Sequence, residues 1–111
     1  MDLVNELNSL SNKLSLSIKS LIKTGKDYAK AYTDYRVALA KELVRLKDDG
    51  MAVTIAYDVA RGKPEIAKLK FNEIATEAVY KANLEAINST KLQIKIIQNQ
   101  IDKEYSSDLP N

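Results

Sequence analysis

Hydrophobic residues recur along the first half of the chain with the spacing of one helical face. Apolar or small residues follow one another every three or four positions, at Leu3, Leu7, Leu10, Leu14, Ile18, Leu21, Gly25, Tyr28, Tyr32, Tyr35, Leu39, Leu43 and Leu46. The mean spacing is about 3.6 residues, the period of an α-helix. Because the phase is kept across Gly25, the pattern predicts a single helix over residues 3–48. Asp48, Asp49 and Gly50 form the stop signal, since glycine readily takes the left-handed conformation that follows a helix.

A second long helix is predicted over residues 64–105. Pro64 and Glu65 favour a helix start, because proline is tolerated at the first helical position and glutamate suits the positive end of the helix dipole. The stripe that follows is less regular and rich in alanine: Ala67, Phe71, Ile74, Ala78, Ala82, Ala86, Thr90, Ile94, Ile97, Ile101 and Tyr105. Residues 106–111 are expected to be a frayed tail.

These two stripes favour an all-α fold, a long antiparallel helical hairpin with coiled-coil-like packing, as one domain over residues 1–105. If residues i and 112 − i face one another, the bulky Tyr28, Tyr32 and Tyr35 lie level with Leu84, Tyr80 and Glu77, amid small alanines. The tip, residues 50–62, is expected to carry a short helix capped by Thr54 and ending at Gly62, with Ile55, Val59 and Tyr57 as its apolar positions.

Several apolar residues fall outside both stripes and would be left in water by an isolated hairpin. They are Val4, Leu16, Ile22, Val44, Leu84, Leu92 and Ile96. An exposed apolar surface of this extent favours self-association. The simplest arrangement is a homodimer that forms a four-helix bundle.

The residue types exclude most familiar catalytic chemistry. The chain has no cysteine and no histidine, so it has no thiolate nucleophile, imidazole base, disulfide or zinc site of the usual kind. Glu73, Glu77 and Glu85 share one side of the second helix, but no Glu-x-x-His pair accompanies them. We therefore expect no enzyme activity, no cofactor and no metal site.

Charge and hydropathy bear on partners and compartment. Seventeen Lys and Arg against fifteen Asp and Glu give a net charge of +2, too little to imply nucleic acid or membrane binding by itself. The longest apolar run, residues 51–57 with Thr54 inside it, is far shorter than a membrane span. Asp2 and Glu6 stand where a signal peptide needs positive charge, so a cytoplasmic location is expected.

Two surfaces are candidates for binding. At the tip, residues predicted to contact a protein partner are Met51, Val53, Ile55, Tyr57 and Arg61; the alternative is that the tip is only a packed cap. Nucleic acid could bind in one of two places. The tip has a sequence pattern similar to a helix-turn-helix, in which Lys63, Lys68 and Lys70 would contact phosphates. Alternatively, phosphates would contact a lysine belt on the stem, formed by Lys19, Lys23, Lys91 and Lys95. A solvated helix face is the other explanation of the belt.

Several segments between residues 35 and 103 resemble small uncharacterised proteins of temperate phages and prophages of Gram-positive bacteria. They are Tyr35-Arg36-Val37-Ala38-Leu39-Ala40, Asp49-Gly50-Met51, Val53-Thr54, Ala60-Arg61-Gly62, Ile66-Ala67-Lys68-Leu69, Tyr80-Lys81-Ala82 and Glu85-Ala86-Ile87-Asn88. The resemblance implies a viral origin and a host cytoplasm, with no activity to transfer. We expect a non-enzymatic accessory protein that binds a host or phage protein, such as a replication, recombination or defence component. The alternative is a nucleic-acid-binding module.

Overall fold

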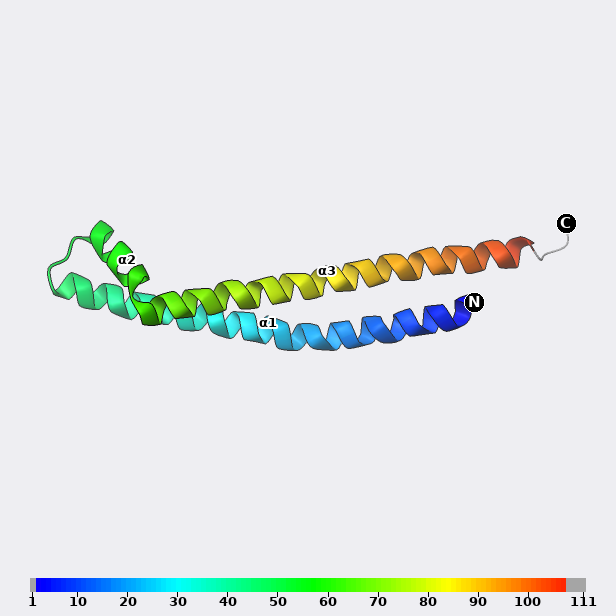
Figure 1. Ribbon diagram of the computed structural model, residues 1–111, viewed down its shortest axis with the longest axis horizontal. Helices are drawn as coiled ribbons and strands as arrows, with labels where there is room; N and C mark the ends of the chain where they lie inside the picture. The colour runs from blue at the N-terminus through cyan, green and yellow to red at the C-terminus, as the bar shows by residue number, and fades with distance from the viewer. Residues whose placement is uncertain (1, 108–111) are drawn as a thin grey trace. The chain divides into compact units, whose positions relative to one another are not determined.

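The computed structural model describes residues 2–107, and over these residues the protein is all-helical, as predicted (Figure 1). Helix α1 spans Leu3–Asp48, α2 spans Val53–Gly62 and α3 spans Pro64–Ser107. The prediction of one helix through Gly25 is confirmed, since α1 continues across this residue. Helix α3 continues through Ser107, two residues beyond its predicted end. Residues 108–111 of the predicted tail lie outside the described residues.

The two ends of α1 are closed by hydrogen bonds that the local sequence supplies. At the start, Asp2 Oδ1 accepts a hydrogen bond of 2.9 Å from the Val4 N–H, the usual capping interaction. At the end, Gly50 has a φ of 89°. Its N–H donates to the Lys47 carbonyl at 2.9 Å, and the Met51 N–H donates to the Leu46 carbonyl at 3.1 Å. This pair of bonds is a Schellman motif, which confirms the stop predicted at Gly50.

The prediction that Thr54 caps α2 is wrong. The helix starts two residues earlier than a Thr54 cap requires, after Ala52, which makes no side-chain capping bond. The Ala56 N–H donates to the Ala52 carbonyl at 2.8 Å, so Thr54 already lies inside the first turn. The predicted end at Gly62 is correct. Lys63 follows in an extended conformation, as expected for a residue before proline, and Pro64 then opens α3.

The chain divides into two compact units. The terminal unit combines residues 2–23 of α1 with residues 81–107 of α3, and the central unit is Thr24–Tyr80. In the terminal unit, Asn83 Nδ2 donates a hydrogen bond of 3.0 Å to the Ser17 carbonyl. Ile87, Thr90 and Ile97 are buried there. The Thr90 hydroxyl donates to the Ala86 carbonyl at 2.8 Å, so this buried side chain has its hydrogen bond.

The core of the central unit combines all three helices. Its buried residues are Tyr35, Leu39, Leu46, Ala56, Ala60 and Ile66, with Ala38, Leu43, Met51 and Leu69 packed against them. Two alanines of α2 are fully buried in this cluster, which lets the short helix approach closely. Helix α2 therefore belongs to the core of the central unit.

The predicted register between α1 and α3 is wrong in the central unit. Tyr28 was expected level with Leu84, but its ring lies 6.0 Å from the ring of Tyr80. Glu42 lies 3.2 Å from Lys63, so α3 starts opposite Glu42 and not opposite the end of α1. The reason is α2, which packs back onto the last turns of α1 and returns the chain to an earlier point along that helix.

The predicted inner stripe of α3 is also wrong over its first half. Ala67, Phe71, Ile74, Ala78, Ala82 and Ala86 were expected to be covered and are exposed. The covered side is centred on Ile66, Leu69, Glu73, Thr76 and Tyr80 in the central unit, and on Asn83, Ile87, Thr90, Ile94, Ile97 and Ile101 in the terminal unit. Ala75, Glu77 and Leu84 are partly buried as well. Steps of three and four residues alternate within each set, as in a coiled-coil seam. The polar residues Glu73, Thr76 and Asn83 lie on the covered side. A prediction based on apolar residues alone therefore chose the opposite face of α3.

Two positions of the α1 stripe need the same correction. Ile18 and Tyr32 were predicted to be covered and are exposed, whereas the adjacent Ser17 and Ala31 are partly buried. The cause is again the shorter period of about 3.5 residues that coiled-coil packing selects. Of the seven apolar residues expected to be left in water, from Val4 to Ile96, all except the half-buried Leu84 are exposed.

Candidate functional site

Helix α2 buries its small side chains and exposes its large ones. Ala56 and Ala60 have no exposed surface, while Ile55 is 57% exposed and Tyr57 is 38% exposed. Val53 and Val59 are exposed as well, and these four residues are called here the α2 apolar surface. With 100° between successive residues, Val53 and Tyr57 lie on one flank of the helix and Ile55 and Val59 on the other. The short helix thus presents apolar groups to solvent on both sides of its buried edge.

A hollow of about 430 Å³ lies beside α2 in the central unit. Helix α1 contributes the apolar floor as well as one aromatic and one cationic side chain, α2 contributes one of each, and α3 contributes a lysine. The lining residues are Tyr35, Arg36, Leu39, Ala40, Leu43, Tyr57, Arg61 and Lys70. Three of them are cations and none is a carboxylate, so the hollow has a positive lining. We call it the cationic hollow.

Aromatic rings hold two of the three cations. The Arg61 guanidinium carbon lies 5.0 Å from the centroid of the Tyr57 ring. The Lys70 ammonium lies 4.8 Å from the centroid of the Tyr35 ring. Both distances are within the range of cation–π attraction, which favours a defined placement of each charge.

The three cations differ in how far their charge is already neutralised. Lys70 donates a hydrogen bond of 2.9 Å to Glu73, and this bond raises the pKa of the lysine. Arg36 and Arg61 form no ion pair with any carboxylate of the part of the chain that the structure describes. Two guanidinium groups therefore remain able to pair with an anion from outside.

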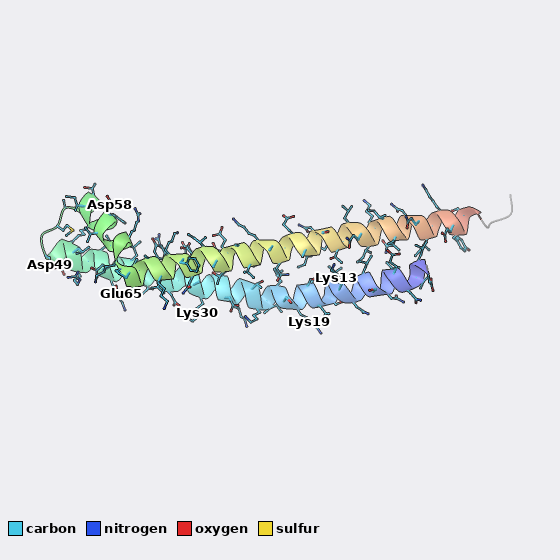
Figure 2. The ribbon with its side chains drawn as sticks, in the orientation of Figure 1. Lys13, Lys19, Lys30, Asp49, Asp58 and Glu65 are labelled. Carbon is cyan, nitrogen blue, oxygen red and sulfur yellow. The ribbon has the colours of Figure 1, made fainter. Side chains whose placement is uncertain are left out.

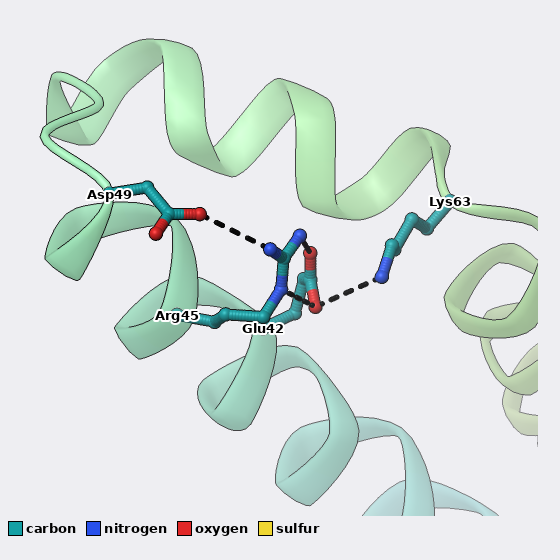
Figure 3. Close-up of polar contacts among 4 residues, drawn as sticks. All are labelled: Glu42, Arg45, Asp49 and Lys63. Atoms are coloured by element: carbon teal, nitrogen blue, oxygen red, sulfur yellow. Dashed lines mark hydrogen bonds and ion pairs between the residues drawn. The ribbon is translucent and has the colours of Figure 1, made fainter.

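A separate ionic cluster connects α1 to the junction between α2 and α3 (Figure 3). Arg45 donates to both carboxylate oxygens of Glu42, at 2.6 Å and 3.2 Å, and Lys63 lies 3.2 Å from Glu42. The hydrogen bond from Arg45 is the main cause that lowers the pKa of Glu42 to about 2, with Lys63 contributing. Arg45 also reaches Asp49 at 3.2 Å. Since Glu42 is buried and paired with two cations, we interpret this cluster as one that stabilises the fold and not as a binding site.

The predicted partner-binding residues of the tip have different environments. Met51 is partly buried against the central core. Val53, Ile55, Tyr57 and Arg61 are exposed, and the last two come together at the cationic hollow. Their spacing of four residues on one helix could have indicated this pairing.

The residues predicted for nucleic acid belong to two alternative surfaces, the tip lysines in the central unit and the lysine belt in the terminal unit. Lys63 pairs with Glu42, Lys70 of the hollow pairs with Glu73, and Lys68 is exposed on α3. Lys19, Lys23, Lys91 and Lys95 are exposed in the terminal unit, where Figure 2 labels Lys19 together with Lys13 on α1.

Sequence reasoning missed all five residues that α1 contributes to the hollow, among them Tyr35 and Arg36. Tyr35 was assigned to the core alone, yet it is both buried and part of the lining. Arg36 was not singled out as a site residue. Its position beside α2 depends on how the short helix folds back, and no local sequence pattern indicates that.

Over residues 2–107, no group of three or more potential metal-ligating side chains gathers in one place. Within the same range, none of the helices combines the length and apolarity needed to cross a membrane. Comparisons of the chain with protein-family models, with curated proteins and with solved structures find no match. The resemblance to phage proteins therefore stays a prediction.

Proposed function

We propose that this protein acts by protein–protein interaction and carries out no catalysis. The observation that carries the proposal is the α2 apolar surface. A helix that buries alanines and exposes Ile55, Tyr57 and two valines leaves in water side chains whose full burial is worth about 1.5–3 kcal/mol each. A partner that covers this surface gains that burial, and aromatic groups such as Tyr57 are favoured anchors at interfaces.

The fold gives the α2 apolar surface a fixed presentation. Ala56 and Ala60 are buried against α1 and α3 residues of the core, and the Glu42 cluster joins α1 to the residue that precedes α3. A partner therefore meets side chains on an already ordered helix and does not have to order it. Such preorganisation increases affinity, because less conformational entropy is lost on binding.

The same proposal includes self-association into a dimer with a four-helix core. Its support is a second apolar face on α3, formed by Ala67, Phe71, Ile74 and Ala78 and called here the outer α3 face. These residues are exposed on the side of the helix away from Ile66, Leu69 and Glu73. A helix with apolar residues on two opposite faces is typical of one that packs on both sides. A second copy can cover the outer α3 face with its own.

The resemblance to phage proteins suggests where the partner would be found. We propose a host or phage protein of replication, recombination or defence, bound in the host cytoplasm. The positive charges predicted for nucleic acid give less support to the alternative, because Lys63 and Lys70 are already paired with carboxylates.

Site-specific photocrosslinking in cells that express the chain tests the proposal. A photoreactive phenylalanine analogue replaces Ile55 on the α2 apolar surface, and a matched control carries it at the exposed Lys41 of α1 in the same unit. The proposal predicts a protein adduct at position 55 that is absent at position 41. Nucleic acid adducts, or identical adducts at both positions, would contradict it.

A further inference from the structure

The cationic hollow has the composition of a binding site for a ligand that is both acidic and apolar. Its volume of about 430 Å³ lies within the usual range of ligand sites and can receive one or two side chains. Leu39, Ala40 and Leu43 provide apolar contact, and the guanidinium groups of Arg36 and Arg61 provide positive charge. A purely apolar ligand would leave the charges unmatched, and a purely ionic one would leave the floor uncovered.

We propose that the cationic hollow binds a carboxylate side chain and an adjacent apolar side chain from an acidic segment of a partner protein. Arginine is well suited to this role, because its planar guanidinium donates two parallel hydrogen bonds to one carboxylate. The stacking of Arg61 on Tyr57 orients one such group in advance. This inference rests on the proposed protein-binding function and adds the chemistry of the partner.

The charge balance of the central unit favours a local carboxylate over a nucleic acid strand. Residues 24–80 carry ten Lys and Arg against nine Asp and Glu, a net charge of +1. Asp49, Asp58 and Glu65, which Figure 2 labels, belong to the same unit. None of the three lines the hollow. Phosphate-backbone binding requires several cationic contacts along the strand. Two available guanidinium groups in one hollow match one or two carboxylates.

The lining of the hollow contains no carboxylate that would compete with this ligand for the two arginines. Glu73 does not line the hollow and is paired with Lys70 at 2.9 Å. Arg36 and Arg61 have no carboxylate partner over residues 2–107. An incoming carboxylate therefore adds an ion pair without breaking one that already exists.

A titration with defined peptides tests the proposal. The probe is the blocked peptide acetyl-Glu-Leu-Phe-Glu-amide, and its neutral counterpart acetyl-Gln-Leu-Phe-Gln-amide has the same shape without charge. Amide chemical shifts of the isotopically labelled full chain report where each peptide binds. We expect the acidic peptide to shift residues of the hollow and to bind at least about tenfold more tightly than the neutral one, a difference of about 1.4 kcal/mol.

Two variants identify the groups responsible. The double substitution Arg36→Gln with Arg61→Gln should reduce binding of the acidic peptide by about tenfold or more, since each removes a charge-assisted hydrogen bond. The control pair Lys41→Gln with Lys68→Gln removes two exposed charges of the same unit outside the hollow and should leave binding unchanged. Circular dichroism and the chemical shifts of distant residues verify that each variant is folded.

Three results would overturn the inference. They are equal affinity for the acidic and neutral peptides, shifts that map away from the hollow, and tighter binding of a short oligothymidine than of the acidic peptide with a steep salt dependence. If any of these occurs while crosslinks at position 55 persist, the proposed protein-binding function stands and only the assignment of this hollow fails. If the crosslinks at position 55 are absent but the acidic peptide binds as expected, the assignment of the hollow stands and the proposed role of the α2 apolar surface fails.

Discussion

Gly25 of α1 lies directly against the ring of Tyr80 of α3. A β-carbon built at Gly25 would be 3.4 Å from Tyr80 Cε1 and 3.8 Å from Cδ1. The ring of Tyr28, almost one helical turn further along α1, lies 6.0 Å from the same tyrosine. The absence of a side chain at Gly25 gives room for this aromatic pair, and the distances correspond to van der Waals contact for a single added methyl group.

This contact predicts that Gly25→Ala stabilises the protein. Alanine is more favourable than glycine inside a helix by about 1 kcal/mol, and the added methyl group meets only the edge of the Tyr80 ring. We expect the free energy of unfolding in urea to rise by about 0.5–1 kcal/mol. A loss of stability would show that the ring cannot adjust. Gly25→Leu is expected to destabilise, because its longer side chain must displace Tyr80.

Gly50→Ala is the matched control and should act in the opposite direction. Nothing lies within 4 Å of a β-carbon at this position, so space is available there. The backbone φ of 89° nevertheless disfavours any L side chain, at a cost of about 1–2 kcal/mol. If Gly50→Ala were neutral, the left-handed turn after α1 would not be needed for the stability of the fold.

A pH dependence follows from Glu42. The pKa of this carboxyl is lowered from 4.5 to about 2 by the hydrogen bond from Arg45 and by Lys63. The folded state therefore stays ionised where the unfolded state takes up a proton. The stabilisation by Glu42 is complete above pH 4.5 and is lost as the pH falls towards 2.

Thermal unfolding of Glu42→Gln at several pH values measures this contribution. The variant should have a lower Tm than the wild type at neutral pH, and the difference should shrink between pH 4.5 and pH 2. Asp34→Gln is a suitable control, because Asp34 pairs with Lys30 one turn away on α1 and the two side chains are 43% and 77% exposed. Solvent screens such a pair, so the variant should show little difference at any pH. A constant difference between Glu42→Gln and wild type across this range would contradict the assigned role of the cluster.

The sequence predicted the helices well, because their ends depend on local chemistry. Gly50 closes α1 through its backbone conformation, and Pro64 opens α3 after the extended Lys63. It predicted the α3 seam poorly, because Glu73 and Thr76 face inward while Phe71 and Ile74 face outward. Both faces of α3 carry apolar residues, so the choice between them depends on contacts with α1 and α2.

The candidate site also has a part that local sequence predicts and a part that depends on tertiary contacts. The tip residues Ile55 and Tyr57 could be proposed from the sequence, since a short apolar helix between two glycines stands out. The cationic hollow could not, because Arg36 and Lys70 come together only through the position of α2 and the register between α1 and α3. That register lies about one turn from the prediction, since Tyr28 meets Tyr80 and not Leu84.

The buried edge of α2 predicts a strong asymmetry between neighbouring substitutions. Ala60→Leu introduces a large side chain where no surface is exposed and should destabilise the protein by about 1–3 kcal/mol. Val59→Ala, on the exposed flank beside it, should change stability by no more than about 0.5 kcal/mol. Urea unfolding followed by circular dichroism measures both. Equal effects would show that α2 does not pack by its alanine edge.

The outer α3 face gives the test of self-association. Phe71 is 69% exposed and Ile74 is 57% exposed, and in the proposed dimer both are buried twice, once on each copy. Each buried apolar side chain contributes about 1.5–3 kcal/mol, so the pair Phe71→Ser with Ile74→Ser should weaken dimerisation by at least about a hundredfold. Sedimentation velocity over a range of concentrations measures this change. The control pair Val37→Ser with Val79→Ser alters exposed residues of the same unit outside the outer α3 face and should leave the dimer intact. A wild-type chain that sediments as a monomer at high concentration would refute the dimer, and equal weakening by both pairs would place the interface elsewhere.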